Sequence, residues 1–140
     1  MTAAADLDEL TRMWAVEHYV GHWDGHSGSS GPNNYFLHSD AAGRFSMLPW
    51  GTDQTWVERT DFGGNVGGRL FRACLEATTC RARYRAALRL VQTRLAGLDL
   101  RAYAMDQHQP YPEAVQQIDV VRELHESAFR HQLAAEGNDE

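Results

Sequence analysis

The stretch NNYFLHSDAAGRFSMLPWGTDQTW, from Asn33 to Trp56, decides the fold of the middle of the chain. Two short runs, 34–38 and 44–49, flank the segment SDAAG, whose Asp and Gly are typical of a hairpin turn. Apolar residues alternate along both runs, as in half-buried strands: Tyr35, Leu37, Phe45 and Met47. The sequence therefore predicts an antiparallel β-hairpin at this place.

Helical patterns lie on both sides of this hairpin. Before it, residues 6–22 have apolar residues at helical spacing, with Asp6 or Thr2 as the cap. A flexible loop rich in Gly and Ser is expected to follow at 25–32. After the hairpin, an irregular stretch at 50–68 is expected to precede three helices, at about 69–76, 81–96 and 112–135. On the second of these, Leu88, Val91, Leu95 and Leu98 mark one face. This order predicts an α+β fold: a helix, a short hairpin and a helical C-terminal half.

The composition limits the classes of function. The 140 residues fit one domain, 1–140, with a frayed tail expected at 135–140. The net charge of −6 and the absence of a basic stripe argue against nucleic acid as a partner. The sequence contains no run of 18 apolar residues, so it predicts no membrane span. Its first residues do not have the pattern of a signal peptide. All 13 basic residues are Arg, so any chemistry that needs a Lys ammonium must use a residue outside this chain.

The two cysteines leave two readings open. Cys74 and Cys80 are too few for a closed zinc site, which needs four ligands. They form one local disulfide if the segment between them turns back on itself, or else they are two free structural thiols. Three histidines at spacing four, His18, His22 and His26, do not continue as a metal-binding helix because Gly21 and Gly25 interrupt it.

Polar residues gather at the predicted ends of the hairpin. Asn33 and Asn34 precede the first strand, and Asp53 follows the second. Asp24, in the loop HWDGHSG, either bonds its own turn or meets these residues in space. Carboxylate and amide oxygens are ligands that suit Mg²⁺, and a carboxylate held apart from the metal can accept a hydroxyl proton. This set of residues is the layout of a phosphoryl-transfer site.

The passage from Trp14 to Trp56, WAVEHYVGHWDGHSG followed by NNYFLHSDAAGRFSMLPWGTDQTW, resembles the spore-coat CotH kinase family. Members of that family carry an hWDg loop, then NYYLY on a strand, then a strand end such as PWDxD. The resemblance implies a divergent protein-kinase-like fold that uses ATP and a divalent metal, Mg²⁺, to phosphorylate Ser and Thr of coat or surface proteins. It covers the passage itself, with a plausible helical continuation to about 135.

The family's site residues carry over only where the motifs match. Asp24 matches the catalytic Asp, and Asn34 matches the Asn that holds metal beside the nucleotide. Asp53 matches the second acidic position of the strand-end motif, and it is expected to bind metal and nucleotide with Asn34. The first acidic position of that motif is Gly51 here, so either Asp53 supplies the carboxylate or the chain is an inactive pseudokinase. The loop SGSSG is also longer than usual in the family.

The resemblance implies the C-terminal part of a kinase domain, similar to a C-lobe, because kinases also need a lobe that provides a Lys and the adenine pocket. The expected partners are ATP and a protein substrate of a coat or surface layer, in a spore-coat, extracellular or cell-surface setting. The alternative is a catalytically inactive, kinase-like module that serves in assembly of such a layer. The DFGG at 61–64, which is similar to the metal motif of protein kinases, is interpreted as a coincidence.

Overall fold

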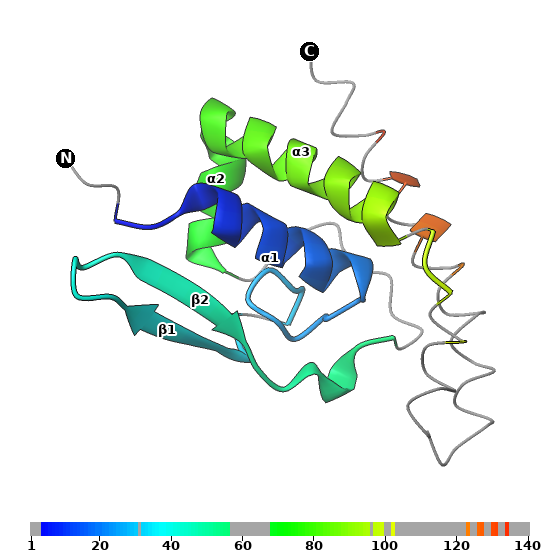
Figure 1. Cartoon of the computed structure of the whole chain (residues 1–140), viewed down its shortest axis with the longest axis horizontal. Coiled ribbons are helices and arrows are strands. Elements are labelled where there is room, and N and C mark those ends of the chain that lie inside the picture. The colour runs from blue at the N-terminus through cyan, green and yellow to red at the C-terminus, as the bar shows by residue number, and fades with distance from the viewer. Residues whose placement is uncertain are drawn as a thin grey trace.

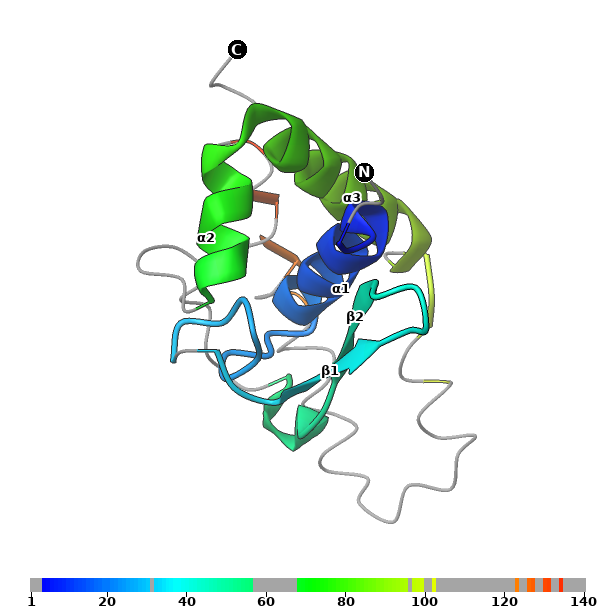
Figure 2. The same ribbon diagram turned by 90° about the vertical axis from the view of Figure 1, so that its left-hand side faces the viewer.

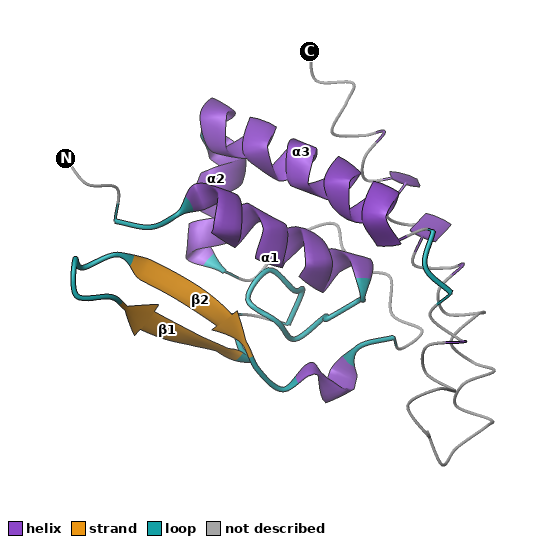
Figure 3. Ribbon diagram, in the orientation of Figure 1, coloured by secondary structure: helices purple, strands orange, loops and turns teal. Residues whose placement is uncertain are grey.

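The computed structural model describes residues 4–30, 32–56, 68–95 and 97–99, and the single positions 102, 123, 126, 127, 130, 131 and 134. The elements among these residues include three α-helices, one short 3-10 helix and a two-stranded hairpin, and the predicted α+β class is confirmed (Figure 3). Helix α1 lies between α3 on one side and strand β2 on the other (Figure 1). The DFGG motif and most of the predicted helix 112–135 lie outside the described residues, and the described positions from 123 to 134 are helical.

Helix α1, Leu7–Tyr19, begins at the predicted cap. The Asp6 carboxylate accepts hydrogen bonds from the backbone N–H groups of Asp8 (2.9 Å) and Glu9 (3.2 Å), which satisfies two donors that a helix start leaves unpaired. The helix ends three residues before the predicted end. Gly21 follows with a φ of 65°, a left-handed conformation that turns the chain toward the loop carrying Asp24.

The hairpin consists of β1, Tyr35–Ser39, and β2, Phe45–Pro49, each within one residue of its predicted bounds. The strands are antiparallel, and Leu37 lies opposite Met47. The Asp40 carboxylate closes the turn by accepting the N–H groups of Ala42 (2.8 Å) and Arg44 (2.9 Å).

The predicted half-buried alternation is wrong for two of its four residues. Met47 is 4% exposed and Tyr35 is half-buried, whereas Leu37 is 57% exposed and Phe45 is also exposed. The reason is that α1 packs over β2 at Met47, while the rest of this two-stranded sheet extends past the helix. A pattern of period two shows which residues share a face, but not which part of that face another element covers.

Two helices follow the stretch 57–67, which lies outside the described residues. Helix α2, Arg69–Glu76, has the predicted bounds, and α3, Thr78–Leu95, begins three residues earlier than predicted. Only Ala77 separates them, and α2 crosses the end of the α1–α3 layer (Figure 2). Of the predicted face of α3, Leu88 and Val91 are buried, but Leu98 is exposed because the helix ends before it.

The core lies where α1, α2 and α3 meet. Phe71 of α2 is fully buried and contacts the rings of Trp14 (5.2 Å between centroids), His18 (5.3 Å) and Tyr84 (5.0 Å). The buried apolar side chains are Leu10, Trp14, Ala15, Tyr19, Met47, Phe71, Cys74, Cys80, Tyr84, Ala87, Leu88 and Val91. No helix among the described residues is long and apolar enough to cross a membrane.

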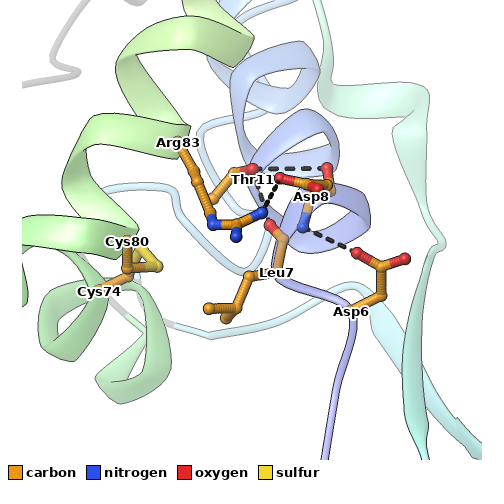
Figure 4. The surroundings of a disulfide bond; sticks show 7 residues. All are labelled: Asp6, Leu7, Asp8, Thr11, Cys74, Cys80 and Arg83. Atoms are coloured by element: carbon orange, nitrogen blue, oxygen red, sulfur yellow. Dashed lines mark hydrogen bonds and ion pairs between the residues drawn. A yellow bond between two sulfur atoms is a disulfide. The ribbon is translucent and has the colours of Figure 1, made fainter. Parts of the chain in front are cut away.

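The two cysteines form a disulfide that joins α2 to α3, which decides between the two readings of the sequence (Figure 4). Their Cα atoms are 5.0 Å apart, within the usual range. Close by, Arg83 of α3 forms an ion pair with Asp8 of α1. The disulfide therefore fixes the tight bend at Ala77, on which the packing of both helices against α1 depends.

Replacing both Cys74 and Cys80 by Ala is expected to lower the free energy of unfolding by about 2 kcal/mol, because the unfolded chain regains the entropy of a short loop. Alanine is chosen because both sites are buried and a Ser hydroxyl there would need a partner. Thermal unfolding should show a midpoint lower by roughly 5–10 °C. Reductant should lower the midpoint of the wild-type protein and leave the double variant unchanged; equal midpoints of both proteins without reductant would contradict the prediction.

Candidate functional site

The loop that carries Asp24 is anchored to α1 by the buried carboxylate of Glu17. Glu17 Oε2 accepts the Ser27 N–H (3.0 Å) and hydroxyl (2.6 Å), and Oε1 accepts the His26 N–H (3.2 Å). Burial raises the pKa of the Glu17 carboxyl, while the hydrogen bonds from Ser27 and His26 act against this shift. His26 and Ser27 are themselves buried, so the prediction of a flexible loop is wrong for this part of 25–32.

Asp24 and Asn34 meet, which is one of the two alternatives that the sequence left open for Asp24. The Asn34 Nδ2 donates to Asp24 Oδ2 at 2.7 Å and to the Asp24 carbonyl at 3.2 Å. Asn34 has a φ of 54°, a left-handed conformation that Asn tolerates better than most residues. Its carbonyl accepts the Trp50 N–H at 2.9 Å, which extends the hairpin pairing to the site. The Asp24 side chain thus faces the start of β1 and does not simply close its own turn.

Gly51 lies directly against this pair. It has a φ of 59°, and a Cβ added to it would stand 2.9 Å from Asn34 Oδ1. The Asn34 amide therefore occupies the space in which a side chain at position 51 would begin, so any larger residue there must displace it.

Asp53 lies two residues further, on the short helix η1, Thr52–Gln54. Its side chain is exposed. The structure therefore brings two of the three predicted site residues into direct contact and puts the third on an exposed turn that begins at Gly51. Asn33, also weighed from the sequence, is exposed.

The three histidines support the site as buried side chains. His18 pairs with the Tyr84 hydroxyl through Nδ1 and with the Ser27 carbonyl through Nε2 (3.2 Å), while His26 stacks on Trp14 with ring centroids 5.6 Å apart. Burial lowers the pKa of both His18 and His26 to about 4, so both rings are neutral at pH 7. Among the described residues, no three His, Cys, Asp or Glu side chains gather as a ligand set for a metal ion.

Acidification below pH 6.5 is expected to destabilise the fold through His18. In the unfolded chain this ring takes up a proton below about pH 6.5, but in the folded protein the pKa of about 4 keeps it neutral. The unfolded state then binds more protons, so stability falls as pH falls from 6.5 toward 4, by about 1.4 kcal/mol per pH unit at full slope. His26 acts in the same direction.

Urea unfolding between pH 7.5 and 4.5 measures this dependence. Glu17 acts against this pH dependence, because a carboxyl group with a raised pKa makes stability fall as pH rises above 4.5. The combined effect of His18 and His26 is expected to be larger than that of the single Glu17. His38 is exposed on β1, and His38→Gln is the matched control that should leave the slope unchanged. Stability that is constant or rises between pH 6.5 and 5 would refute the prediction.

Sequence reasoning missed Glu17, His22 and Ser27. Glu17 and His18 fall on the same face of α1 as Leu10 and Trp14, the face that the structure buries. A carboxylate on an apolar helix face was the available signal, because such a group is buried only when its oxygens are hydrogen-bonded. No comparable signal marked Ser27.

The comparisons with known proteins identify a family. The family model described as CotH kinase protein matches residues 2–139, nearly the whole chain. No curated protein and no solved structure matches, so the likeness to a kinase C-lobe has no structural neighbour in support. The family match includes Asp24, Asn34, Gly51 and Asp53, and on its extent the chain belongs to the CotH kinase family.

Proposed function

We propose that this chain carries the catalytic and metal-binding part of a CotH-type protein kinase, which transfers the γ-phosphate of ATP to Ser or Thr of a coat or surface protein. The observation that carries the proposal is the 2.7 Å hydrogen bond between Asn34 Nδ2 and Asp24 Oδ2, at the point where the loop after α1 meets the hairpin. It joins a carboxylate, which can accept a proton, to an amide, whose oxygen is of a ligand type that suits Mg²⁺. Membership of the family supports ATP and Mg²⁺ as the general cofactors.

Asp24 has the role of the base in this proposal. The substrate hydroxyl oxygen bonds to the γ-phosphorus as the bond to the leaving ADP oxygen breaks, and the hydroxyl proton passes to Asp24. Oδ1 of Asp24 is buried beside His22, so Oδ2 is the atom that takes the proton. Asn34 holds that oxygen in place through its Nδ2.

Asn34 and Asp53 are the residues that would hold Mg²⁺. The Asn34 amide donates from Nδ2 to Asp24, and its Oδ1 lies on the side of Gly51. Amide and carboxylate oxygens are ligands that Mg²⁺ accepts together with water and phosphate oxygens. The metal supplies charge compensation to the phosphates when bound.

The chain would act as a single partial domain, 1–140, equivalent to the C-terminal part of a kinase-like domain. It contains no Lys, so a Lys that pairs with the nucleotide phosphates must come from elsewhere. The proposed partners are ATP and the substrate protein.

Thermal unfolding with and without Mg-ATP tests the proposal, in the wild-type protein and in Asp53→Asn. A ligand that binds only the folded state stabilises it by about 2.7 kcal/mol at 100 times its Kd. We expect a raised midpoint that needs both Mg²⁺ and the Asp53 carboxylate. Asp99→Asn, at an exposed position away from the hairpin, is the matched control and should keep the full shift. No shift of the wild-type midpoint at millimolar Mg-ATP would count against a nucleotide site in this chain.

Gly51 favours a second candidate, an inactive kinase-like module that serves in assembly of a coat or surface layer. Gly51→Asp restores the missing carboxylate, and Asp tolerates the left-handed conformation of this position. Its Cβ would approach Asn34 Oδ1 to 2.9 Å, so Asn34 must shift slightly. Phosphate transfer that appears only in Gly51→Asp would support the inactive module, whereas transfer by the wild-type protein would exclude it.

A further inference from the structure

A row of three side chains leads from α1 into the candidate site. Glu17 Oε1 lies 3.9 Å from His22 Nδ1, and His22 Nε2 lies 3.4 Å from Asp24 Oδ1. The imidazole of His22 thus has a carboxylate oxygen beside each ring nitrogen. Asp24 in turn meets Asn34 through its other oxygen.

The row is buried, and bare backbone covers it. Glu17 and His22 have almost no exposed surface, and the Asp24 side chain is 18% exposed. A Cβ added to Gly25 would stand 2.8 Å from both Glu17 Oε1 and His22 Nδ1, so no side chain fits at that position. Charged groups are buried in this way only where they are paired.

Two atoms of the row face each other without a hydrogen bond. His22 Nε2 and Asp24 Oδ1 are both buried, and neither makes a hydrogen bond among the described residues. The two atoms are 3.4 Å apart, and an approach of a few tenths of an ångström would give a hydrogen bond of ordinary length. Oδ2 of Asp24 is already held by Asn34, and His22 is the side chain beside its other oxygen.

We infer that Glu17 is a positioning residue that orients the Asp24 carboxylate through the His22 imidazole. The inference rests on the proposed function in assigning a catalytic role to Asp24. Both ring nitrogens of His22 face a carboxylate oxygen, so the position of the Glu17 carboxylate determines where the ring lies against Asp24. Glu17 faces the ring from α1 and Asp24 from its own loop, while Glu9 and Arg12 line the same cavity of about 410 Å³ as His22.

Glu17 thereby links two tasks. Its hydrogen bonds to Ser27 and His26 fix the path of the loop, and its Oε1 lies beside the His22 ring that faces Asp24. A Gln at this position keeps the size and can still accept a hydrogen bond from Ser27, but it removes the charge. Ser27→Ala removes one hydrogen bond and keeps the charge, so the two variants separate these tasks.

Nitrogen NMR of the histidine side chains tests the inference without an activity assay. The ring-nitrogen signals of His22 are expected to change in Glu17→Gln, because the carboxylate beside Nδ1 is removed, and to remain as in the wild-type protein in Ser27→Ala. His22 signals that are the same in Glu17→Gln and in the wild-type protein would overturn the inference.

A kinetic measurement adds the link to Asp24. Glu17→Gln is expected to lower kcat for phosphate transfer about tenfold, with KM for ATP within about twofold, because the base is misplaced and the nucleotide ligands are not. Unchanged kcat would overturn the inference. If the wild-type protein does not bind Mg-ATP, that result counts against the proposed function. The NMR measurement would still decide whether Glu17 positions His22.

Discussion

Asp24→Asn is expected to lower the rate of phosphate transfer by at least about 100-fold, because a positioned general base contributes roughly 10²–10⁴ to such reactions. The amide is nearly the same size as the carboxylate but cannot take the hydroxyl proton. In the wild-type protein the Asn34 Nδ2 donates to Asp24 Oδ2 at 2.7 Å. In the variant, this donor meets either the carbonyl or the NH₂ group of the new amide. Transfer of labelled phosphate to a Ser- and Thr-containing protein measures the effect.

The control for Asp24→Asn is Asp99→Asn, the same chemical change at an exposed carboxylate outside the site. It should leave the rate within about twofold of the wild-type rate. The Mg-ATP-dependent midpoint of Asp24→Asn should also remain close to the wild-type value, because Asp24 is assigned to the proton and not to the metal. A rate for Asp24→Asn equal to that of the control would remove Asp24 from the chemistry.

Phe71→Ala is expected to lower the free energy of unfolding by about 3–5 kcal/mol, which is a large part of the stability of an ordinary domain. Phe71 is fully buried, and its ring contacts Trp14, His18 and Tyr84, so its removal opens a cavity where three helices meet. The surrounding rings belong to different helices and cannot all move into the space. Urea unfolding followed by tryptophan fluorescence measures the loss.

Phe36→Ala is the matched control for Phe71→Ala. Phe36 is 56% exposed on β1, where it contacts Trp50 at 5.8 Å between ring centroids. Removing a side chain that stays largely in water should change the free energy of unfolding by no more than about 0.5–1 kcal/mol. Equal losses in the two variants would mean that the core does not lie at Phe71.

Elements with a local cause were predictable from the sequence. The cap at Asp6 and the hairpin turn at Asp40 depend on hydrogen bonds between groups a few residues apart, and the structure agrees with both. The bounds of α2 also agree with the prediction. The end of α1 was predicted three residues late. The apolar pattern continues to Val20, which extends the predicted helix. The helix ends earlier because the backbone at Gly21 adopts a left-handed conformation, which the apolar pattern does not show.

The candidate site was predictable to the extent that it follows from the hairpin. Asn34 lies just before β1 and Gly51 lies two residues after β2, so an antiparallel pair brings these positions together. The contact of Asn34 with Asp24 was one of two alternatives open from the sequence, and the structure has it at 2.7 Å. The sequence did not predict the close contact between Gly51 and the Asn34 amide, because residue spacing does not give interatomic distances.

The sequence by itself determined the order of the elements, the hairpin with its turn, and the residue types that make phosphate chemistry possible. Only the tertiary structure decided that the two cysteines are bonded, that Leu37 is exposed and Met47 buried, and that Glu17 lies beside His22. The physical reason is the range of the forces involved. Caps and turns are fixed by hydrogen bonds within a few residues, whereas burial, and the protonation that follows from it, depend on which distant elements lie alongside.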